Sequence, residues 1–579
     1  KYNYKRKFWQ PQYLVYGQDG EINELGSRKD AILSEQFTES LKYTMENVLK
    51  YDKSFNGRHK ISALLGYTVE KTDYSTVSVE KRDFISNSVK VFDGGASLTG
   101  INGSDNYHRI VGKLGRLQYN YNDRYLLSVS MRNDGSSNFG SENRYAWFPG
   151  ASVGWNVSEE RFMENIKQID NLKLRTSYGE VGNQGIPSYL YSAYVDGNID
   201  YVWGPESSDE IGAGAIQRGY GNPFVQWETN ISRNIGVDLT MFGGKLTFSA
   251  DYYKNDKKDM LLSVLLPAST GTTVPNDWAN KYNSKIANVG DMVNKGIEMS
   301  ASYKHKSSNG FNWSVSGTFT KNNNEITNLG DLDKIALQDS KPGNWRATQQ
   351  DITTYMVPGY EAGAFFLIKT NGIIKTTEQL SEVKKYQPNA QMGDVIMVNQ
   401  LTVDTDGDGV PDAADNTIND DDRVYAGSGM AEWEAGLILN AEYKGFDISA
   451  QLFYSYGNEV FNGSKLFAYA MNRHKDLYYM WTPQNLNSDI PTGRTNSEHD
   501  NWRGRTDYFL EDGTYLRIRN LSLGYTIPKN FIKGIDNMRW YVTAQNPFTF
   551  TKYDGYDPEI GGNGVSTRGI DKGVYPVTR

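Results

Sequence analysis

Residues 445–457 read GFDISAQLFYSYG, and this stretch decides the fold class because its apolar side chains recur at every second position. Successive side chains of a β-strand point to opposite faces, whereas a helix repeats its apolar side chains every three to four residues. The stretch therefore predicts a two-faced strand. Its apolar face would carry Phe446, Ile448, Ala450, Leu452, Tyr454 and Tyr456, opposite Asp447, Ser449, Gln451 and Ser455.

The same alternation recurs along nearly the whole chain, for example in KLTFSADYYK at residues 245–254. Most such segments are about 9–11 residues long, which is the length of a tilted strand that crosses a membrane. Aromatic residues often lie near the expected strand ends, as in the aromatic girdles of membrane barrels. They include Tyr125, Tyr252, Tyr253, Tyr443 and Trp540.

The connections between these segments are expected to alternate in length. Tight turns built on Gly, Asn or Asp are predicted at residues 121–124, 242–245 and 444–446. Short turns at one end and long loops at the other are typical of an outer-membrane barrel, whereas soluble sandwiches do not sort their loops by end. The predicted long connections are 94–107, 179–227, 267–295, 328–356 and 458–514, and residues 377–386 form either a short helix or a polar loop.

Composition excludes several classes of protein. The 579 residues carry 61 Lys+Arg and 69 Asp+Glu, a net charge of −8, without a clustered basic stretch, which argues against a nucleic-acid partner. The absence of cysteine excludes thiolate zinc sites, disulfides and cysteine nucleophiles. No apolar run approaches the roughly 18 residues of a spanning helix. Paired carboxylates, a nucleophile elbow and phosphate loops are not apparent, so an enzyme is not expected.

One segment has the spacing of a metal site. Residues 404–415 read DTDGDGVPDAAD, with carboxylates at loop positions one, three, five, nine and twelve and Gly at position six. This is the calcium-loop arrangement, with Asp in place of Glu at the last position. We expect residues 393–423 to be a Ca²⁺-binding loop insertion, the alternative being a solvated acidic turn. The predicted ligands are Asp404, Asp406, Asp408, the Val410 carbonyl, Asp412 and Asp415.

Aromatic and basic residues in the long connections are candidates for substrate contact. Trp side chains could stack on sugar rings or peptide side chains, although packing within the loops is the simpler interpretation. The basic segments 217–220 and 502–505 could contact an anionic substrate or a lipoprotein partner, although a lumen-facing charge or a contact on the lipopolysaccharide side is the preferred interpretation. The loop tryptophans are Trp203, Trp278, Trp345, Trp481 and Trp502.

A series of short blocks carries further information through its order and spacing. In series, these blocks resemble the barrel of the SusC/RagA-type TonB-dependent outer-membrane transporters of Bacteroidetes. They are YAWFPGASVGW at 145–155, SEERF at 158–162, LKLRTSYG at 172–179, GNQG at 182–185, WETN at 227–230, NIGVD at 234–238, DYY at 251–253, NVG at 288–290, NKGIE at 294–298, FLEDGTYLRIRN at 509–520, LGY at 523–525, AQN at 544–546 and YDPE at 556–559.

The resemblance implies an all-β fold, a large antiparallel transmembrane β-barrel of 22 strands with long extracellular loops. It also implies TonB-energised import of oligosaccharides or peptides, with a SusD-like surface lipoprotein, TonB and outer-membrane lipid and lipopolysaccharide as partners. About 15–18 strand candidates are present, so we expect residues 1–579 to be the barrel region, without the N-terminal plug and the last strand. A TonB-dependent siderophore or cobalamin receptor and a soluble calcium-bound glycan-binding β-protein are the alternatives.

Overall fold

The computed structural model describes most of the chain, and the following account is confined to that part. The described residues are 2–23, 26–196, 201–203, 210–212, 214–265, 284–343, 351–494, 501–528, 534–535, 537–562 and 564–573. No described helix is both long enough and apolar enough to cross a membrane.

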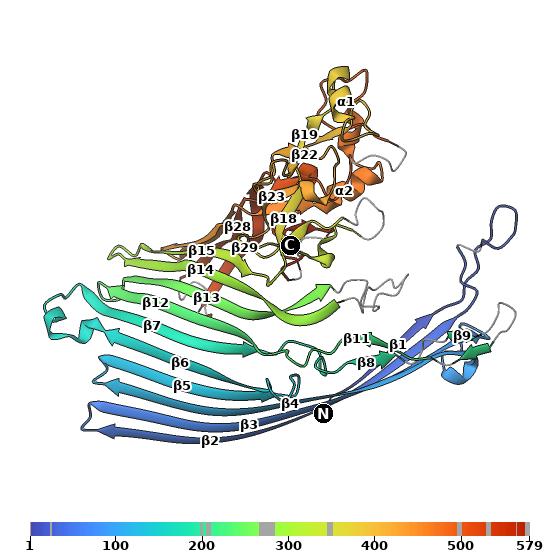
Figure 1. The fold of residues 1–579 in the computed structure, drawn as a ribbon. Helices are drawn as coiled ribbons and strands as arrows, with labels where there is room; N and C mark the ends of the chain where they lie inside the picture. Colours follow the sequence, from blue (N-terminus) through green and yellow to red (C-terminus); the bar gives the residue numbers. More distant parts are fainter. Residues whose placement is uncertain are drawn as a thin grey trace.

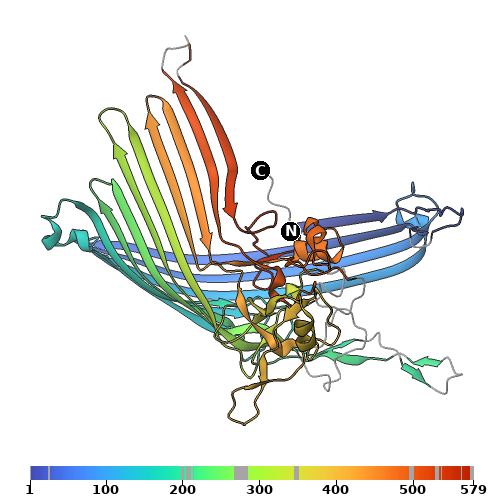
Figure 2. The same ribbon diagram turned by 90° about the horizontal axis from the view of Figure 1, so that it is seen from above.

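One antiparallel sheet dominates the described residues (Figure 1). Its fifteen strands follow one another in chain order, so nearly every strand pairs with its neighbours in the sequence. This confirms the predicted all-β fold, and β1 and β29 form the two edges of the curved sheet (Figure 2). In order the strands are β1 (Tyr2–Gln10), β2 (Ile32–Phe55), β3 (His59–Phe84), β4 (Gly95–Tyr121), β5 (Tyr125–Ser136), β6 (Tyr145–Asn156), β7 (Ile169–Asn183), β12 (Glu228–Met241), β13 (Leu246–Leu265), β14 (Ser284–Lys306), β15 (Asn312–Asn328), β24 (Trp433–Tyr443), β25 (Phe446–Tyr456), β28 (Tyr515–Ile527) and β29 (Met538–Thr551).

The three predicted tight turns are confirmed. Asn122 and Asp123 have φ of 53° and 55°, and Lys444 and Gly445 have φ of 49° and 89°. Positive φ at both central residues matches the right-handed twist of the flanking strands, which is why Asn, Asp and Gly are found there. All three turns lie at the same end of the sheet (Figure 1).

Several strands are much longer than the predicted 9–11 residues. β2, β3 and β4 contain 24, 26 and 27 residues. Residues 94–107, predicted as a long loop, therefore lie almost entirely in β4, and residues 284–295 of another predicted loop lie in β14. Glycine and polar residues suggested loops, but the cross-strand ladder continues through them because most of these residues pair with β3 or β13, with a local shift of register in each ladder.

The two faces of the sheet differ in chemistry, as the alternation predicts. Tyr125, Leu127, Val129 and Met131 alternate along β5, and all four are exposed. Directly paired residues share a face, so the register extends this outer face across the sheet. The result is an apolar band on the outer face, whose side chains are each 41–75% exposed, and not a core buried between two layers. Its members are Leu117, Leu127, Val129, Val153, Ile235, Tyr252, Ile297, Ile448, Leu523 and Val542.

Aromatic side chains mark the strand ends on this outer face. Tyr125, Tyr443 and Trp540 are exposed there, as predicted for a girdle. Tyr253 departs from that prediction because it points to the opposite, inner face, where its hydroxyl donates to Asn322 Oδ1 at 2.8 Å. Tyr252 is exposed on the outer face within β13 rather than at its end.

The long connections at the other end of the sheet fold into a separate body, the loop layer, formed by residues 329–343, 351–432, 457–494 and 501–514 together with 552–573 (Figure 1). Its largest core packs Phe365, Leu367, Phe461, Tyr469 and Phe509. Its elements are β16 (Ile335–Ala336), β17 (Thr354–Met356), β18 (Ala364–Ile368), β19 (Thr370–Ile373), α1 (Thr377–Val383), β20 (Val395–Met397), β21 (Leu401–Val403), β22 (Ala413–Ala414), β23 (Arg423–Ser428), β26 (Glu459–Asn462), α2 (Gly463–Ala470), β27 (Leu510–Asp512) and β30 (Ile570–Asp571).

Helix α1 settles the alternative at residues 377–386 in favour of a helix, which ends at Val383. The Thr376 side chain accepts from the Gln379 N–H at 3.2 Å, and the Gln379 side chain accepts from the Thr376 N–H, so a capping box starts the helix. The side chain of Val383, the last residue of the helix, is buried in a small apolar cluster. Helix α2 and two small hairpins were not expected from the sequence. The hairpins pair β8 (Tyr194–Asp196) with β11 (Ile216–Gly219) and β9 (Tyr201–Trp203) with β10 (Glu210–Gly212).

Candidate functional site

The inner face of the sheet carries a charged network that crosses three strands. Arg175 of β7 pairs with Asp238 of β12 at 3.0 Å and with Asp251 of β13 at 2.5 Å. The three residues alternate with outer-face apolar residues, so they point away from the apolar band. Charge-assisted pairs of this kind hold a guanidinium in a fixed orientation. The inner wall of the sheet is therefore polar and charged.

A second polar cluster lies farther along the same strands. Glu228 is buried, and its carboxylate accepts from Asn183 Nδ2 at 3.0 Å, from the Leu261 N–H at 3.1 Å and from Lys257 Nζ at 2.9 Å. A buried carboxylate is tolerated when its oxygens are hydrogen-bonded and neutralised in this way. Glu228 thereby ties β12 to both of its neighbours.

Arg517 joins the sheet to the loop layer. Its guanidinium contacts Asp557, Glu559 at 2.6 Å and Thr549 Oγ1 at 3.0 Å, and it is almost fully buried. Arg519 reaches the other oxygen of Glu559 at 3.2 Å. Two arginines of β28 therefore fix the segment after β29 against the inner face.

A cavity of about 400 Å³ lies next to this junction, between the inner face and the loop layer. The sheet contributes Asn322, Glu434 and Phe453, and the loop layer contributes Met430 and Arg568. Arg519 also lines the cavity and lies 3.8 Å from the centroid of the Phe453 ring, a cation–π contact. An aromatic ring, amide groups and charges of both signs can contact a sugar ring or a peptide.

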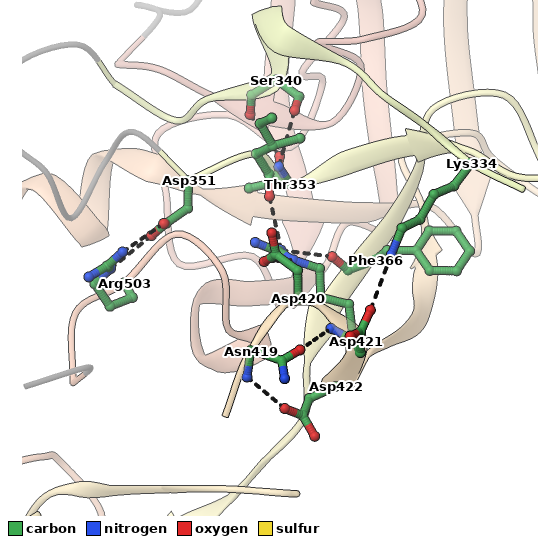
Figure 3. Close-up of polar contacts among 12 residues, drawn as sticks. Lys334, Ser340, Asp351, Thr353, Phe366, Asn419, Asp420, Asp421, Asp422 and Arg503 are labelled. Carbon is green, nitrogen blue, oxygen red and sulfur yellow. Dashed lines mark hydrogen bonds and ion pairs between the residues drawn. The ribbon is translucent and has the colours of Figure 1, made fainter. Parts of the chain in front are cut away.

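The predicted loop tryptophans divide between buried and undescribed residues. Trp481 and Trp502 are 6% and 3% exposed, so they pack inside the loop layer, as the simpler interpretation held. Trp278, Trp345 and the side chain of Trp203 lie outside the described residues, as do the side chains of residues 216–219. Arg503 of the basic segment 502–505 pairs with Asp351 through two contacts of 2.8 and 2.9 Å (Figure 3).

Residues 404–412 of the acidic segment form the tip of the β21–β22 hairpin, and Asp415 follows β22. Carboxylate oxygens of Asp404, Asp406 and Asp408 lie within 4.8 Å of one another, and all three residues are exposed. Asp404 accepts from the Gly407 and Gly409 N–H groups at 2.7 and 2.8 Å, and these bonds lower the pKa of its carboxyl. Both glycines have positive φ, 79° and 87°, which lets the chain turn back on itself.

The other three predicted ligands have different partners. Asp412 accepts from the Thr405 N–H and hydroxyl at 2.9 Å, and Asp415 accepts from the Thr417 N–H at 2.8 Å. Val410 is 63% exposed. The structure thus gathers the first three of the six predicted ligands, and Ca²⁺ binding by the set, like the 393–423 insertion, stays a prediction.

The base of the acidic segment is fixed by buried groups. Asp422 is fully buried, and it accepts from the Asn419 N–H at 2.8 Å (Figure 3). It also accepts from the Gln400 N–H at 2.7 Å. Arg423 bonds Asp420 at 2.9 Å and the carbonyl of Phe366 at 3.1 Å. The residues that follow the exposed tip are therefore held in place by hydrogen bonds and an ion pair.

The residues of these clusters lie in sequence blocks that indicate the family, but the sequence alone did not predict their contacts. LKLRTSYG, NIGVD and DYY supply Arg175, Asp238 and Asp251, and YLRIRN and YDPE supply Arg517 and Glu559. The available signal was opposite charges at polar-face positions of consecutive strands. The register that brings them together is a property of the folded sheet.

Comparison with known proteins gives a consistent result. A family model described as "TonB dependent receptor-like, beta-barrel" matches residues 1–371. TonB-dependent receptor P3 of Formosa agariphila is 30% identical over 546 residues, covering 92% of this chain and 51% of that protein. TonB-dependent receptor SusC of Bacteroides thetaiotaomicron is 28% identical over 478 residues, covering 81% of this chain and 42% of that protein.

A solved structure shares the fold. The RagAB peptide transporter structure superposes with a TM-score of 0.74 at 24% identity, covering 98% of this chain and 57% of that chain. The chain thus spans about half the length of the curated relatives and of the solved chain that it matches.

Proposed function

Since the chain belongs to the TonB-dependent receptor-like β-barrel family, we propose that it is of the SusC/RagA type and that the complete protein imports oligomeric nutrients across the outer membrane. The chain would be the channel-forming subunit, located in the bacterial outer membrane. The cargo would be glycans or peptides, and TonB would supply the energy through parts of the protein outside these residues.

The two-faced sheet is the observation that carries this proposal. Its apolar outer band matches a hydrocarbon environment, while the inner face presents Arg175, Asp238 and Asp251 to a polar space. The 400 Å³ cavity beside Phe453 and Arg519 lies where a polar oligomer would pass beneath the loop layer. A wall of this kind favours passage of a solute over catalysis.

We further propose a SusD-like surface lipoprotein as partner. The loop layer covers the end of the sheet opposite the tight turns, which is the extracellular end in barrels of this class (Figure 1). The name of the superposed RagAB peptide transporter supports a two-protein assembly by analogy. Copurification of the complete protein with a SusD-like lipoprotein from native outer membranes tests this partner, and recovery of the protein alone in mild detergent would contradict it.

Uptake in a deletion strain tests the transport proposal. Growth on candidate peptides and oligosaccharides as sole nutrient should fail for one class and return on complementation. Phe453→Ala, which removes the ring from the cavity, should complement poorly. Phe446→Ala, a 57%-exposed residue on the outer face of the same strand, is the matched control and should complement fully.

Three outcomes would redirect the proposal. Normal growth of the deletion strain on every oligomer would overturn it. Loss of ferric siderophore or cobalamin uptake alone would favour the alternative receptor function. Equal complementation by both variants would leave transport standing but remove the cavity at Phe453 from the path of the substrate.

We propose in addition that the acidic tip binds a structural Ca²⁺. Asp404, Asp406 and Asp408 would hold the ion, because three converging carboxylates supply the hard oxygen ligands that Ca²⁺ prefers. The bound cation would relieve the repulsion between these carboxylates and stiffen the tip. Val410, Asp412 and Asp415 would complete the site only by exchanging their present partners.

Calorimetric titration of the complete protein with CaCl₂ tests this proposal. Asp406→Asn should weaken binding, whereas Asp421→Asn should not, because Asp421 lies at the base of the loop near Lys334, at 3.9 Å. Heat signals unchanged by Asp406→Asn would show that any calcium binds elsewhere.

A further inference from the structure

Among the described residues, the connection between β6 and β7 on the tight-turn side of the sheet is longer than a tight turn. Residues 157–168 join β6 to β7 and form two 3₁₀ turns, η2 (Val157–Glu159) and η3 (Arg161–Met163). The neighbouring connections there, such as Lys444–Gly445, are tight turns. We call residues 157–168 the foot. Its Phe162 is 63% exposed and its Ile166 is 41% exposed.

The foot is clamped onto the outer face of the sheet. Glu160 Oε1 accepts from the Tyr125 hydroxyl at 2.6 Å and from Trp155 Nε1 at 3.1 Å, and Arg124 pairs with Oε2 at 3.1 Å. Tyr125 and Trp155 are directly paired on β5 and β6, on the face that carries the apolar band. One carboxylate therefore holds the foot against two aromatic residues of the girdle.

The far end of the foot is tied to the next tight turn. The Phe242 N–H donates to the Gln168 carbonyl at 2.9 Å, and the Gly244 N–H donates to Asp170 Oδ2 at 2.9 Å. Within the foot, the Met163 N–H donates to the Glu160 carbonyl at 2.9 Å. Because the segment is held at both ends, the exposure of Phe162 and Ile166 is a fixed feature of its surface.

We propose that the foot is a lipid anchor, with Phe162 and Ile166 seated at the headgroup–acyl boundary of the leaflet on the tight-turn side. The foot continues the apolar outer face and is bonded to girdle residues, so the medium that contacts the girdle also contacts the foot. Exposed Arg161 and Lys167 flank the two apolar residues and suit phosphate groups.

The foot also carries Glu159 and Glu164, both exposed, so its charges are mixed. This balance fits a leaflet rich in zwitterionic phospholipid better than a strongly anionic surface. A periplasmic protein is the competing occupant. The lipid assignment is preferred because Glu160 directs the foot toward the outer face and not toward the inner space, where soluble partners would enter.

Depth measurement on the complete protein in phosphatidylethanolamine–phosphatidylglycerol nanodiscs tests the anchor. A nitroxide on Phe162→Cys is compared with one on Glu164→Cys, a matched polar position in the same foot. These 579 residues contain no cysteine, so each label is unique within them. Position 162 should show a several-fold higher ratio of oxygen to nickel-chelate collisions than position 164. Equal ratios would overturn the anchor, and shielding of position 162 from both reagents would indicate protein contact and overturn it too.

Phe162→Trp provides a second readout that keeps the apolar ring. Its added fluorescence should be quenched by phospholipids brominated near the headgroup and not by aqueous iodide. Quenching by iodide alone would contradict the proposal. Retention of the heat-modifiable gel mobility would show that each variant is folded.

Discussion

The sheet and the loop layer are assembled in opposite ways. In the sheet, the strands follow their order in the chain and most pair with the strand before or after them, and their apolar side chains stay exposed in a continuous outer band. In the loop layer, Thr354 bonds the Ser566 carbonyl, 212 positions away, and Thr370 bonds Asp507, 137 positions away. Phe365 and Phe461 of its core are fully buried.

The difference teaches where each region obtains its stability. The sheet uses backbone ladders between neighbours and lipid around its outer band. The loop layer uses a water-excluding core and long-range polar contacts, as soluble domains do. Substitutions of one chemical kind should therefore have different effects in the two regions, and the following predictions rank such effects from large to small.

The largest effect is expected from truncating the loop-layer core. Phe461→Ala removes a fully buried ring and should destabilise the loop layer by about 3–5 kcal/mol, because a cavity is left behind. Denaturant titration of hydrogen exchange in residues 457–494 measures it. Phe446→Ala in the outer band is the control, and lipid chains should fill its space at a smaller cost. Equal losses for both would break the comparison.

A charge placed on either face of one strand sharpens the comparison within the sheet. Val129→Arg faces the apolar band and should cost about 2–4 kcal/mol near the bilayer midplane. Ser128→Arg faces an open space of about 700 Å³ on the inner face, which Asp52 and Asn120 help to line, and should cost little. Refolding yield into lipid vesicles at rising urea measures both. Should Ser128→Arg prove the more harmful variant, the assignment of faces would be reversed.

The loop layer should respond to pH through Glu459. Burial, together with Asp512 directly across β26 and β27, raises the pKa of the Glu459 carboxyl from its ordinary 4.5 to about 7. The folded state then keeps a proton that the unfolded chain releases, so stability falls as pH rises from about 4.5 to about 7.

Glu459→Gln should remove this pH dependence. The total change in the free energy of unfolding between pH 4.5 and pH 7 is on the order of 1–2 kcal/mol after allowance for solvent screening. Thermal unfolding of the loop layer at several pH values, with protease cleavage as the readout of unfolding, measures this pH dependence. Glu382→Gln is a control, since Glu382 is an exposed partner of Lys385. A slope that survives Glu459→Gln would assign the pH response to another group.

The smallest effect is local. Thr376→Ala removes the side-chain acceptor of the α1 capping box and should destabilise that helix by about 1 kcal/mol. Hydrogen exchange of residues 377–383 should rise while the amides of β25 stay protected. Protection unchanged in α1 would mean that packing of Val383, and not the cap, holds the helix.

Much of the sheet could be predicted from the sequence. Alternation in residues 445–457 and the turn residues Lys444–Gly445 set a strand and its hairpin with short-range information alone. The strand lengths could not be predicted. Residues 94–107 suggested a loop, yet β4 runs through them because β3 pairs with most of this stretch, including Gly100 and Gly103.

The site was less predictable than the fold. The acidic spacing at 404–415 is local, and three of its carboxylates do converge. The cavity beside Phe453 is lined by residues of four strands and three loop segments, so no single stretch of sequence predicts it. The foot could not be predicted either, because the block SEERF at 158–162 does not show that Glu160 accepts a hydrogen bond from Tyr125 of β5.

The sequence by itself determined the two-faced strands, the turns, the family and the acidic tip, because each depends on residues a few positions apart. Only the tertiary structure decided that Arg517 meets Glu559, that Arg175 meets Asp251 and that the foot lies against the girdle. Those contacts depend on strand register and on how distant loops pack. Register and packing are set by the sum of many weak interactions across the whole fold, and no local pattern encodes that sum.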